Sequence, residues 1–428
     1  MVVLEERDNK PALLLAVASI AVYGISSGFV TGPEQTPWFL AAYSVAWMLY
    51  LGLFLHGRNR DFVASPWVLL VWAGLGRLLL CPTEPWLSDD LWRYLLDGRV
   101  LLEGTNPFRY APEAPWVQER FGALAARVNH PEVPTIYPPL VQLTGALAAL
   151  FGLMETGWRV LVSLIDLAAM FVVSRLFGGG DRGWRAAAVY GLCPLAIFEA
   201  GANGHLEALA TLPLVYAVRA MQQRRPWRAG VAFAAAILVK YYAILLLPLW
   251  WRRQGFRRMA ATSIALTLLA LLPFMLGGVD IFAGLKAYLS HWSFNSPLYA
   301  LLGALPVADV ILRAAPYFIA AAVALIAGWR RDDPVAVIPM LLFGFLVIGP
   351  TLHPWYALWI LPWLGARPHP GLWAFVAAMG LSYAVWWSVA LHGVWELPAG
   401  VPEIMWSIVA IGWLFSFWRH RAGTPEAA

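Results

Sequence analysis

The sequence predicts an all-α protein, a polytopic transmembrane helical bundle of about 12–14 spans. Of its 428 residues, 60% are hydrophobic and only 13% are charged, whereas a soluble globular domain carries roughly 25% charged residues. Apolar runs of about twenty residues recur from end to end, and each is long enough to cross the ~30 Å hydrocarbon core as a helix. These observations exclude a soluble enzyme, a secreted disulfide scaffold and a disordered chain. We treat residues 1–428 as a single integral-membrane domain.

The expected spans follow one another along the chain. Each is a predominantly apolar run between more polar segments. In chain order they are 12–31, 37–55, 66–82, 158–177, 186–202, 204–220, 258–277, 309–329, 335–350, 354–366, 371–391 and 402–418.

Charge is distributed unevenly between the loops. From Thr83 to Thr135 the chain carries eight acids and five Arg, a net charge of −3, so the remainder carries +8 to reach the total of +5. Because Lys and Arg are enriched in cytoplasmic loops, the acidic segment 83–137 is expected to be an external, periplasmic-side loop. This topology explains the positive net charge, and we expect no nucleic-acid partner. The basic clusters that mark the other side are Arg58/Arg60, Arg182/Arg185, Arg224/Arg225/Arg228, Arg252/Arg253/Arg257/Arg258, Arg330/Arg331 and Arg419/Arg421.

Two segments do not fit a simple alternation of crossings. The run 229–250 has Arg clusters on both sides, although it is long enough for one crossing. A re-entrant hairpin that turns near Lys240 would place both of its ends on the cytoplasmic side, and such backbone is tolerated where it lines a cavity. The run 138–153 also breaks the parity, and we expect a short or partly inserted helix there.

The external loop begins with a segment rich in acidic and aromatic residues. On a helix, Asp90, Tyr94 and Asp97 share one stripe, and Asp89 lies one turn from Arg93. A carboxylate here could accept the proton of a hydroxyl that attacks an electrophilic carbon. The alternative is structural: the acidic pair stabilises a helix N-terminus, and Arg93 with Asp97 forms an ordinary surface pair.

Lys240 lies within an apolar run. A charge there costs on the order of 2.5–3.5 kcal/mol by insertion scales unless it is paired or hydrated, so we expect a function or a specific partner. With Arg93 and nearby His residues, Lys240 could bind a departing phosphate group. Trp92, Tyr94 and Tyr137 offer rings that could stack on sugar faces.

Other polar residues interrupt the apolar runs on the side of the acidic loop, whereas the opposite loops contain mostly Arg. We expect them to belong to one non-cytoplasmic site, the alternative being that they are ordinary loop residues. They are Asn203, His205, Glu207, Tyr241, His291, Asn295, His353 and Tyr356.

Some of these residues keep two interpretations. His205 and Glu207 are either a binding pair or a cap at the start of a helix. His353 either contacts the substrate or caps a short helix, and His291 and Asn295, four apart, can share a helix face. No close cluster of His, Asp and Glu has the spacing of a metal site, so we predict no cofactor; a divalent metal is not supported.

Asp166 stands alone in an apolar span. We expect it to pair with Arg159 in a structural role, because a buried carboxylate needs a partner.

These motifs resemble those of the GT-C superfamily of integral-membrane glycosyltransferases, in particular bacterial polyprenol-phosphate-mannose-dependent mannosyltransferases and the mannosyltransferase that builds glycosylphosphatidylinositol anchors. The first external loop of the anchor-building enzyme has an Asp-rich start, an Asp eight residues later, Glu-Gly, a Pro-aromatic pair and a Tyr-x-Pro turn. The matching residues here are Ser88-Asp89, Asp97, Glu103-Gly104, Pro107-Phe108 and Tyr137-Pro138-Pro139. The bacterial relatives share the islands Asn203-Gly204-His205-Leu206-Glu207-Ala208, Val239-Lys240-Tyr241-Tyr242, Phe294-Asn295 and His353-Pro354-Trp355-Tyr356.

Two departures from the family pattern leave roles open. The anchor-building enzymes place a second Asp two residues after the first, where this chain has Leu91, so the resemblance leaves open which of Asp89 and Asp90 would be the base. Relatives often have Asn-Asp where this chain has Leu206-Glu207, which leaves the role of Glu207 open.

The resemblance implies a GT-C-like fold with a large external loop in its first module and an inverting glycosyltransferase activity. The donor would be a polyprenyl-phosphate-linked hexose, most often mannose in these relatives, and the acceptor a lipid or a glycan. The enzyme would lie in a bacterial cytoplasmic (inner) membrane as a multi-pass protein, with its active site on the non-cytoplasmic side. A transporter or flippase of lipid-linked glycans is the main alternative, since it would also have many spans and an intramembrane Lys. A non-catalytic subunit of an envelope assembly is a third.

Overall fold

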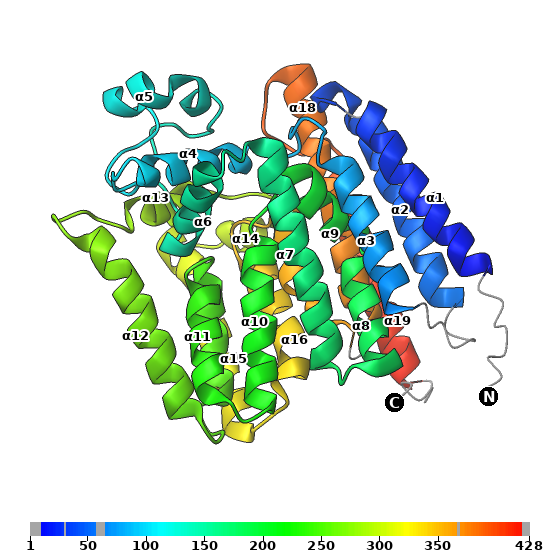
Figure 1. Cartoon of the computed structure of the whole chain (residues 1–428). Coiled ribbons are helices and arrows are strands. Elements are labelled where there is room, and N and C mark those ends of the chain that lie inside the picture. The colour runs from blue at the N-terminus through cyan, green and yellow to red at the C-terminus, as the bar shows by residue number, and fades with distance from the viewer. Residues whose placement is uncertain (1–9, 30, 57–64, 366–368, 422–428) are drawn as a thin grey trace.

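The computed structural model describes residues 10–29, 31–56, 65–365 and 369–421. In these ranges the chain is helical, with no strand and one isolated bridge between Phe294 and Thr351. Arg58 and Arg60 lie outside the described residues. The long helices run side by side as a bundle (Figure 1). The prediction of an all-α fold is confirmed.

Five helices of the described chain are long and apolar enough to cross a membrane, and a sixth span is added if the bent pair Gly180–Gly191 and Pro194–Asn203 counts as one. These findings confirm a polytopic helical membrane protein, while the total of 12–14 spans stays a prediction. The five are Pro33–Phe54, Phe256–Met275, Asp309–Arg330, Pro370–His392 and Val401–Arg421.

The N-terminal part of the chain forms one edge of the bundle and then crosses its end. The edge consists of α1 (Lys10–Phe29), η1 (Pro33–Gln35), α2 (Thr36–His56) and α3 (Pro66–Leu80). The helices α4 (Asp90–Leu102) and α5 (Pro115–Ala125) lie over one end of the bundle (Figure 1).

The next helices, between residues 139 and 275, form the middle of the bundle. It contains α6 (Pro139–Leu150), α7 (Glu155–Leu176), α8 (Gly180–Gly191), α9 (Pro194–Phe198), the π-helical turn η2 (Glu199–Asn203), α10 (Glu207–Gln222), α11 (Pro226–Ile237), the 3-10 helix η3 (Tyr241–Trp250) and α12 (Phe256–Met275). The expected short helix in 138–153 is α6, whose 12 residues extend only about 18 Å.

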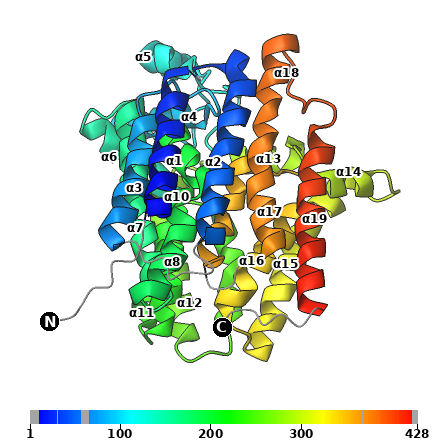
Figure 2. The same ribbon diagram turned by 90° about the vertical axis from the view of Figure 1, so that its right-hand side faces the viewer.

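The C-terminal part completes the bundle and supplies one wall of the site. It contains α13 (Ala283–His291), α14 (Pro297–Gly303), α15 (Asp309–Arg330), α16 (Pro334–Ile348), η4 (Pro354–Trp359), η5 (Leu361–Trp363), α17 (Pro370–Met379), η6 (Gly380–Ala384), α18 (Val385–His392) and α19 (Val401–Arg421). Figure 2 shows α17 to α19 standing together beside α15 and α16. Many of the chain's helices begin with Pro, whose missing N–H costs nothing at a first helical position.

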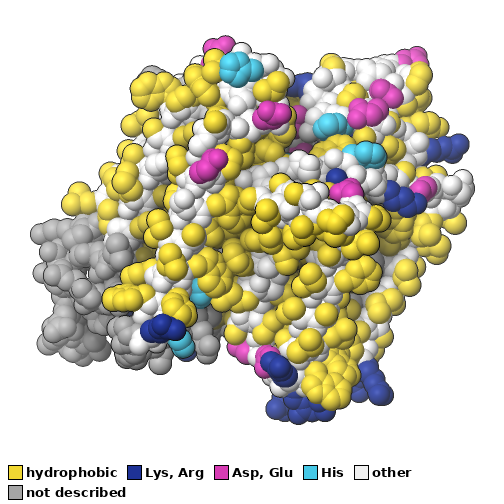
Figure 3. Space-filling model, turned by 180° about the vertical axis from the view of Figure 1, so that it is seen from behind, with side chains coloured by type: hydrophobic (Ala, Val, Ile, Leu, Met, Phe, Trp, Pro, Cys, Tyr) yellow, Lys and Arg dark blue, Asp and Glu magenta, His cyan; other side chains and the backbone are white. Residues whose placement is uncertain are grey.

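The two ends of the bundle differ in charge. The turns after α10, η3 and α15, which carry Arg clusters, lie at the end opposite α4 and α5 (Figure 1). On the face in Figure 3, Asp, Glu and His side chains lie mostly toward the upper end, a group of Lys and Arg forms the lower tip, and the middle is mostly hydrophobic. Such a band suits the hydrocarbon region of a bilayer.

The segment between Pro226 and Gly255 turns back on itself. A Cβ atom on Gly255 would lie 3.0 Å from the Cβ of Pro226, so the two ends of the segment are neighbours. Lys240 has an extended backbone (φ −146°, ψ 123°) between α11 and η3 and forms the turn. At this tip, the Leu140 N–H donates to the Leu238 carbonyl over 3.1 Å, which fastens the hairpin to the start of α6.

A close backbone contact fixes α4 on α6. A Cβ atom on Gly98 would lie 2.1 Å from the carbonyl carbon of Gly145, and one on Gly145 would lie 2.5 Å from the Tyr94 carbonyl oxygen. Only glycine permits this approach, since any side chain would push the helices apart. The contact fixes the position of the acidic N-terminus of α4.

The buried partner of Asp166 is Arg77, not the expected Arg159. Arg77 on α3 donates to the Asp166 carboxylate through Nε, at 2.8 Å, and through Nη2, and Tyr190 also donates to it. Arg159 instead donates to main-chain carbonyls, among them that of Ala202. The expectation failed because Arg159 and Asp166 are two turns apart on one helix, about 10 Å, whereas Arg77 comes from the neighbouring helix.

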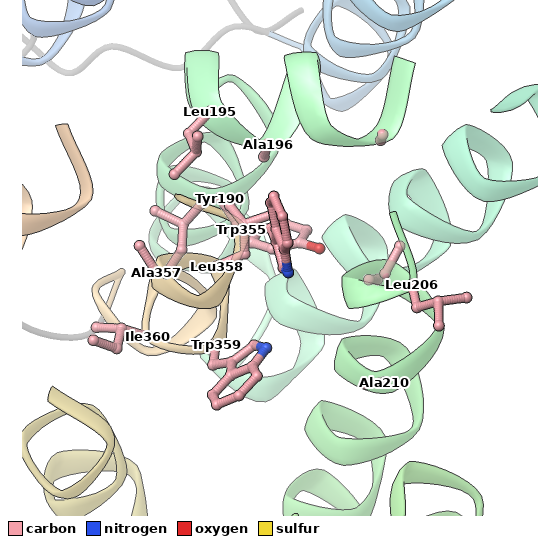
Figure 4. Close-up of a cluster of buried hydrophobic side chains, with 14 of the residues drawn as sticks. Tyr190, Leu195, Ala196, Leu206, Ala210, Trp355, Ala357, Leu358, Trp359 and Ile360 are labelled. Atoms are coloured by element: carbon pink, nitrogen blue, oxygen red, sulfur yellow. The ribbon is translucent and has the colours of Figure 1, made fainter. Parts of the chain in front are cut away.

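A buried aromatic cluster joins η4 to the centre of the bundle. Figure 4 shows Trp355 and Trp359 of η4 between the α8–α9 region and Leu206 at the start of α10. Trp355 is 8% and Trp359 6% exposed. Packing on both sides therefore holds η4 where its polar residues face the site.

Candidate active site

A cavity of about 860 Å³ lies beside the N-terminal end of α4. Its walls come from the start of α4, the segment 129–138, the tip of the α11–η3 hairpin, α13, α15, α16 and the segment 349–359. The predicted site residues on its wall are Asp89, Asp90, Arg93, Tyr137, Lys240, Tyr241, His291, His353 and Tyr356. Residues from five separate parts of the sequence thus meet in one space.

Asp89 occupies the N-cap position of α4, but its side chain makes no capping hydrogen bond. Its Oδ1 instead accepts a hydrogen bond of 2.6 Å from Nδ2 of Asn129. The carboxylate therefore lies on the cavity wall and does not complete the helix, which argues against the purely structural interpretation of the pair.

Asp90 is surrounded by donors. Its Oδ2 accepts from the Tyr137 hydroxyl at 3.0 Å and from the Tyr94 hydroxyl at 3.5 Å. Nε2 of His205 lies 3.7 Å from the same oxygen, within ion-pair range. Asp90 is thus held in place by three side chains.

The two adjacent carboxylates differ in proton affinity. Burial and the charge of Asp90 raise the pKa of Asp89 to about 7, with Asn129 and His205 opposing the change. Burial also favours the neutral form of Asp90, but His205, His353 and Lys240 outweigh it and bring its pKa to about 2. Near neutral pH, Asp90 stays ionised and Asp89 is the better proton acceptor.

Lys240 lies at the hairpin tip and lines the cavity. It donates to the Glu207 carboxylate, which is buried, and lies 5.2 Å from the centre of the Tyr356 ring. The Trp359 indole N–H lies 3.4 Å from the same Glu207 oxygen. The specific partner expected for Lys240 is therefore Glu207.

Arg93 holds the end of the loop that follows α5 against α4. Its guanidinium group donates to the carbonyls of Val133 at 2.9 Å, His130 at 3.2 Å and Asn129 at 3.4 Å. The segment 129–133 is thereby held beside α4, and Asn129 reaches Asp89. The structure shows Arg93 positioning the loop at the edge of the cavity.

The residues of η4 and its surroundings form an aromatic wall. The His353 ring stacks on Trp355 at 4.4 Å and an interplanar angle of 3°. The Tyr356 hydroxyl shares a 2.7 Å hydrogen bond with that of Tyr288. His291 lies on the cavity wall at the end of α13.

Six predicted residues are not on the cavity wall: Tyr94, Asp97, Asn203, His205, Glu207 and Asn295. His205 and Glu207 are buried and contact the wall residues Asp90 and Lys240, respectively. Tyr94 and Asp97 are buried in α4, Asn203 is buried in η2, and Asn295 lies 4.0 Å from the Met379 sulfur. Tyr94 and Asn203 still contact residues that bear on the site, whereas Asp97 faces the Thr135 and Arg93 side of the helix.

Glu199 is a polar residue of the site that sequence reasoning missed. Its side chain is buried and accepts hydrogen bonds from Asn203, His205 and Tyr383. It occurs in an apolar run, and a carboxylate within such a run is a sequence signal that could have identified it. Asn129 and Tyr383 carry no comparable signal.

No group of three or more His, Cys, Asp or Glu side chains that could hold a metal ion occurs among the residues that the structure describes.

Asp97→Asn should make the protein more stable at neutral pH. Burial raises the pKa of Asp97 from 3.8 to about 6, with Arg93 and Thr135 opposing it. A carboxyl group that binds its proton more tightly in the folded state costs stability as the pH rises through about 4 to 6. The variant should therefore gain about 1–3 kcal/mol at pH 7.5 and little at pH 4.5. Thermal unfolding in detergent at both pH values measures this; a gain of equal size at both would contradict the assignment.

The family model of glycosyltransferase family 87 matches residues 135–354, just over half of the chain. The matched part includes the sites of His205, Lys240 and His353, and it begins after the two carboxylates of α4. Comparisons with curated proteins and with solved structures gave no match.

Proposed function

The chain belongs to glycosyltransferase family 87, a GT-C-type family of membrane glycosyltransferases, and from this we propose that it transfers a hexose from a polyprenyl-phosphate-linked donor to a lipid or glycan acceptor. The proposed sugar is mannose, and the proposed place is the outer face of a bacterial cytoplasmic membrane. The observation that carries the proposal is the pair Asp89 and Asp90 on the wall of a cavity of about 860 Å³ that also contains Lys240.

In the proposed reaction Asp89 accepts the proton of an acceptor hydroxyl. The hydroxyl oxygen forms a bond to the anomeric carbon of the donor sugar from the face opposite the phosphate. The bond between that carbon and the phosphate oxygen breaks, and the anomeric configuration inverts. Asp89 has the proton affinity that a base needs near neutral pH.

Lys240 is proposed to stabilise the departing lipid phosphate. An ammonium group in a site with little water interacts strongly with a developing phosphate charge. Glu207 keeps Lys240 paired when no phosphate is bound. The guanidinium of Arg93 already serves three main-chain carbonyls, so the proposal gives it a positioning role.

The apolar side of the cavity suits the lipid part of such a donor. Leu245 of η3, Tyr317 of α15 and Phe345 of α16 line it. Ile244 and Tyr317 are 51% and 36% exposed, so this wall continues onto the outer surface of the bundle. A polyprenyl chain could therefore lie between the hairpin and α15 while its phosphate reaches Lys240.

The proposed topology predicts opposite labelling of two engineered cysteines. Glu119 on α5 and Arg225 before α11 are both exposed, and native Cys81 and Cys193 are buried. In intact cells, Glu119→Cys should react fully with a membrane-impermeant maleimide and Arg225→Cys only after permeabilisation. Labelling of both from the same side would overturn the proposed orientation.

The test of the activity is an assay with two labelled donors. Purified protein in detergent or vesicles is given radiolabelled polyprenyl-phosphate mannose or polyprenyl-phosphate glucose with a membrane lipid extract as acceptor. Transfer from the mannose donor supports the full proposal, and transfer from the glucose donor alone corrects the sugar. Movement of the intact donor across vesicles without any transfer would favour the flippase.

A further inference from the structure

Glu199 is a buried carboxylate whose side-chain hydrogen bonds come from Asn203, His205 and Tyr383. It is 1% exposed and lies in the π-helical turn η2. Its Oε1 accepts from the Tyr383 hydroxyl at 2.5 Å, and its Oε2 accepts from Asn203 Nδ2 at 2.8 Å and His205 Nδ1 at 2.6 Å. π-Helical turns are frequent at functional sites, where they change which side chains face one another.

His205 connects Glu199 to Asp90. Nδ1 of the imidazole is 2.6 Å from Glu199, and Nε2 is 3.7 Å from Oδ2 of Asp90. The ring stacks on Trp355 with centroids 4.1 Å apart, and Nε2 is buried with no hydrogen-bond partner among the described residues. The ring thus has one carboxylate on each nitrogen and one fixed orientation.

The backbone conformation at Gly204 fixes the position of His205. Gly204 ends η2 in the left-handed region at φ 65°, and a Cβ atom there would lie 2.8 Å from Cγ of Arg159 and 2.9 Å from Cδ1 of Trp158. The Trp158 indole N–H donates to the Gly204 carbonyl at 2.8 Å. Any other residue would be strained and crowded here, so the turn directs His205 toward α4.

We propose that Glu199 is a positioning residue for sugar transfer: through His205 it keeps Asp90 ionised, so that Asp89 alone of the pair takes up the acceptor proton. This inference rests on the proposed function and adds a residue to it. A carboxylate on Nδ1 favours the charged imidazolium, whose Nε2–H then faces Asp90. Glu199, His205 and Asp90 thus form a chain of interacting groups, and of these three only Asp90 is adjacent to the proposed base, Asp89.

Other charged groups near the pair do not replace Glu199. His353 and Lys240 also lower the pKa of Asp90, but His205 has the larger influence. Glu207 lies near His205 on the same segment, yet it is paired with Lys240. Without Glu199 the imidazole loses its nearest negative partner, and two adjacent carboxylates without a strong cation hold a proton more tightly.

Glu199→Gln is the variant that tests this role. It retains the size of the side chain and removes its charge. We expect the acid limb of the kcat–pH profile to move up by about one pH unit, with kcat at pH 6 lower by up to about tenfold and near recovery at pH 8.5. KM for the donor should change less than about threefold. A purely structural role would lower activity equally at all pH values, and that result would overturn the proposal.

A double-mutant cycle tests whether Glu199 acts through His205. His205→Gln should produce a similar shift of the acid limb, and Glu199→Gln should add less than about twofold in that background. Full additivity would contradict the proposal. Glu199→Asp, which keeps the charge, should recover part of the shift. If Glu199→Gln fails to fold by size-exclusion chromatography, His205→Gln alone decides: an unchanged acid limb would overturn the inference.

Asp166→Asn is the matched control. Asp166 is equally buried at 3% exposure, but its partners are Arg77 and Tyr190. It should lower thermal stability without moving the acid limb, and a moved limb would show that any buried carboxylate has the effect. Absence of transfer by the wild-type enzyme would defeat the proposed function, whereas an active wild type with an unmoved Glu199→Gln profile would defeat only this inference.

Discussion

Asp89→Asn should lower kcat for sugar transfer by about 10³-fold and leave folding and donor binding almost unchanged. The substitution removes the group with a pKa of about 7, and a positioned general base typically contributes about 10²–10⁴-fold. An amide can still accept the hydrogen bond from Asn129, so the loss should be confined to proton transfer. Initial rates with labelled polyprenyl-phosphate mannose, together with a binding assay for the same donor, measure both quantities.

Asp90→Asn is the paired variant and should behave differently. Loss of the Asp90 charge removes one cause of the raised pKa of Asp89, so the acid limb should move to lower pH. The rate should fall by about 10–100-fold because Tyr137 and His205 lose a charged partner and keep at most a weaker hydrogen bond to an amide. Near-normal activity in Asp89→Asn together with an inactive Asp90→Asn would assign the base to Asp90.

Lys240→Met should cost both stability and activity. The substitution leaves the Glu207 carboxylate, which is 2% exposed, without its cation. Breaking one side of a buried ion pair typically costs about 3–5 kcal/mol. Thermal unfolding should therefore begin well below the wild-type temperature, and transfer should fall by at least about 10²-fold.

The double variant Lys240→Met/Glu207→Gln separates the two effects. Removing both charges avoids the unpaired carboxylate, so stability should return to within about 1 kcal/mol of the wild type. Transfer should stay low, because no ammonium group remains to receive the phosphate. Recovery of transfer in the double variant would show that Lys240 is only a structural partner of Glu207.

Much of the site could be predicted from the sequence, because its residues break local rules. Asp89 and Asp90 are adjacent acids in a chain poor in charge, and Lys240 is a cation in an apolar run. A charged side chain in an apolar segment is unfavourable, and the structure of a single helix does not compensate for it. Such a residue therefore indicates a functional role or a specific partner. The structure brings all three onto one cavity wall, and the all-α polytopic fold follows from the same apolar runs.

The remaining features depend on contacts between distant parts of the chain. Asn129 reaches Asp89 only because Arg93 holds the loop, and Tyr383 is 184 residues from Glu199. Periodicity describes faces of single helices and says nothing about which helices are neighbours. For the same reason, the sequence predicts a pair between Asp166 and Arg159 of the same helix, whereas the folded chain pairs Asp166 with Arg77 of a neighbouring helix.

The attachment of segment 129–133 to Arg93 has a consequence for how this enzyme class can diversify. Residues 103–128 begin at the C-terminal end of α4, and the segment that follows them is bound to Arg93 near the N-terminal end of the same helix. They therefore form a loop whose two ends are both fixed to α4, the helix that carries Asp90. Lengthening a closed loop costs little, about 0.6 kcal/mol per doubling. The stretch around α5 can therefore be exchanged or extended without moving Asp89. Sequence changes in this stretch can therefore alter the surface around α5 while the position of Asp89 stays the same.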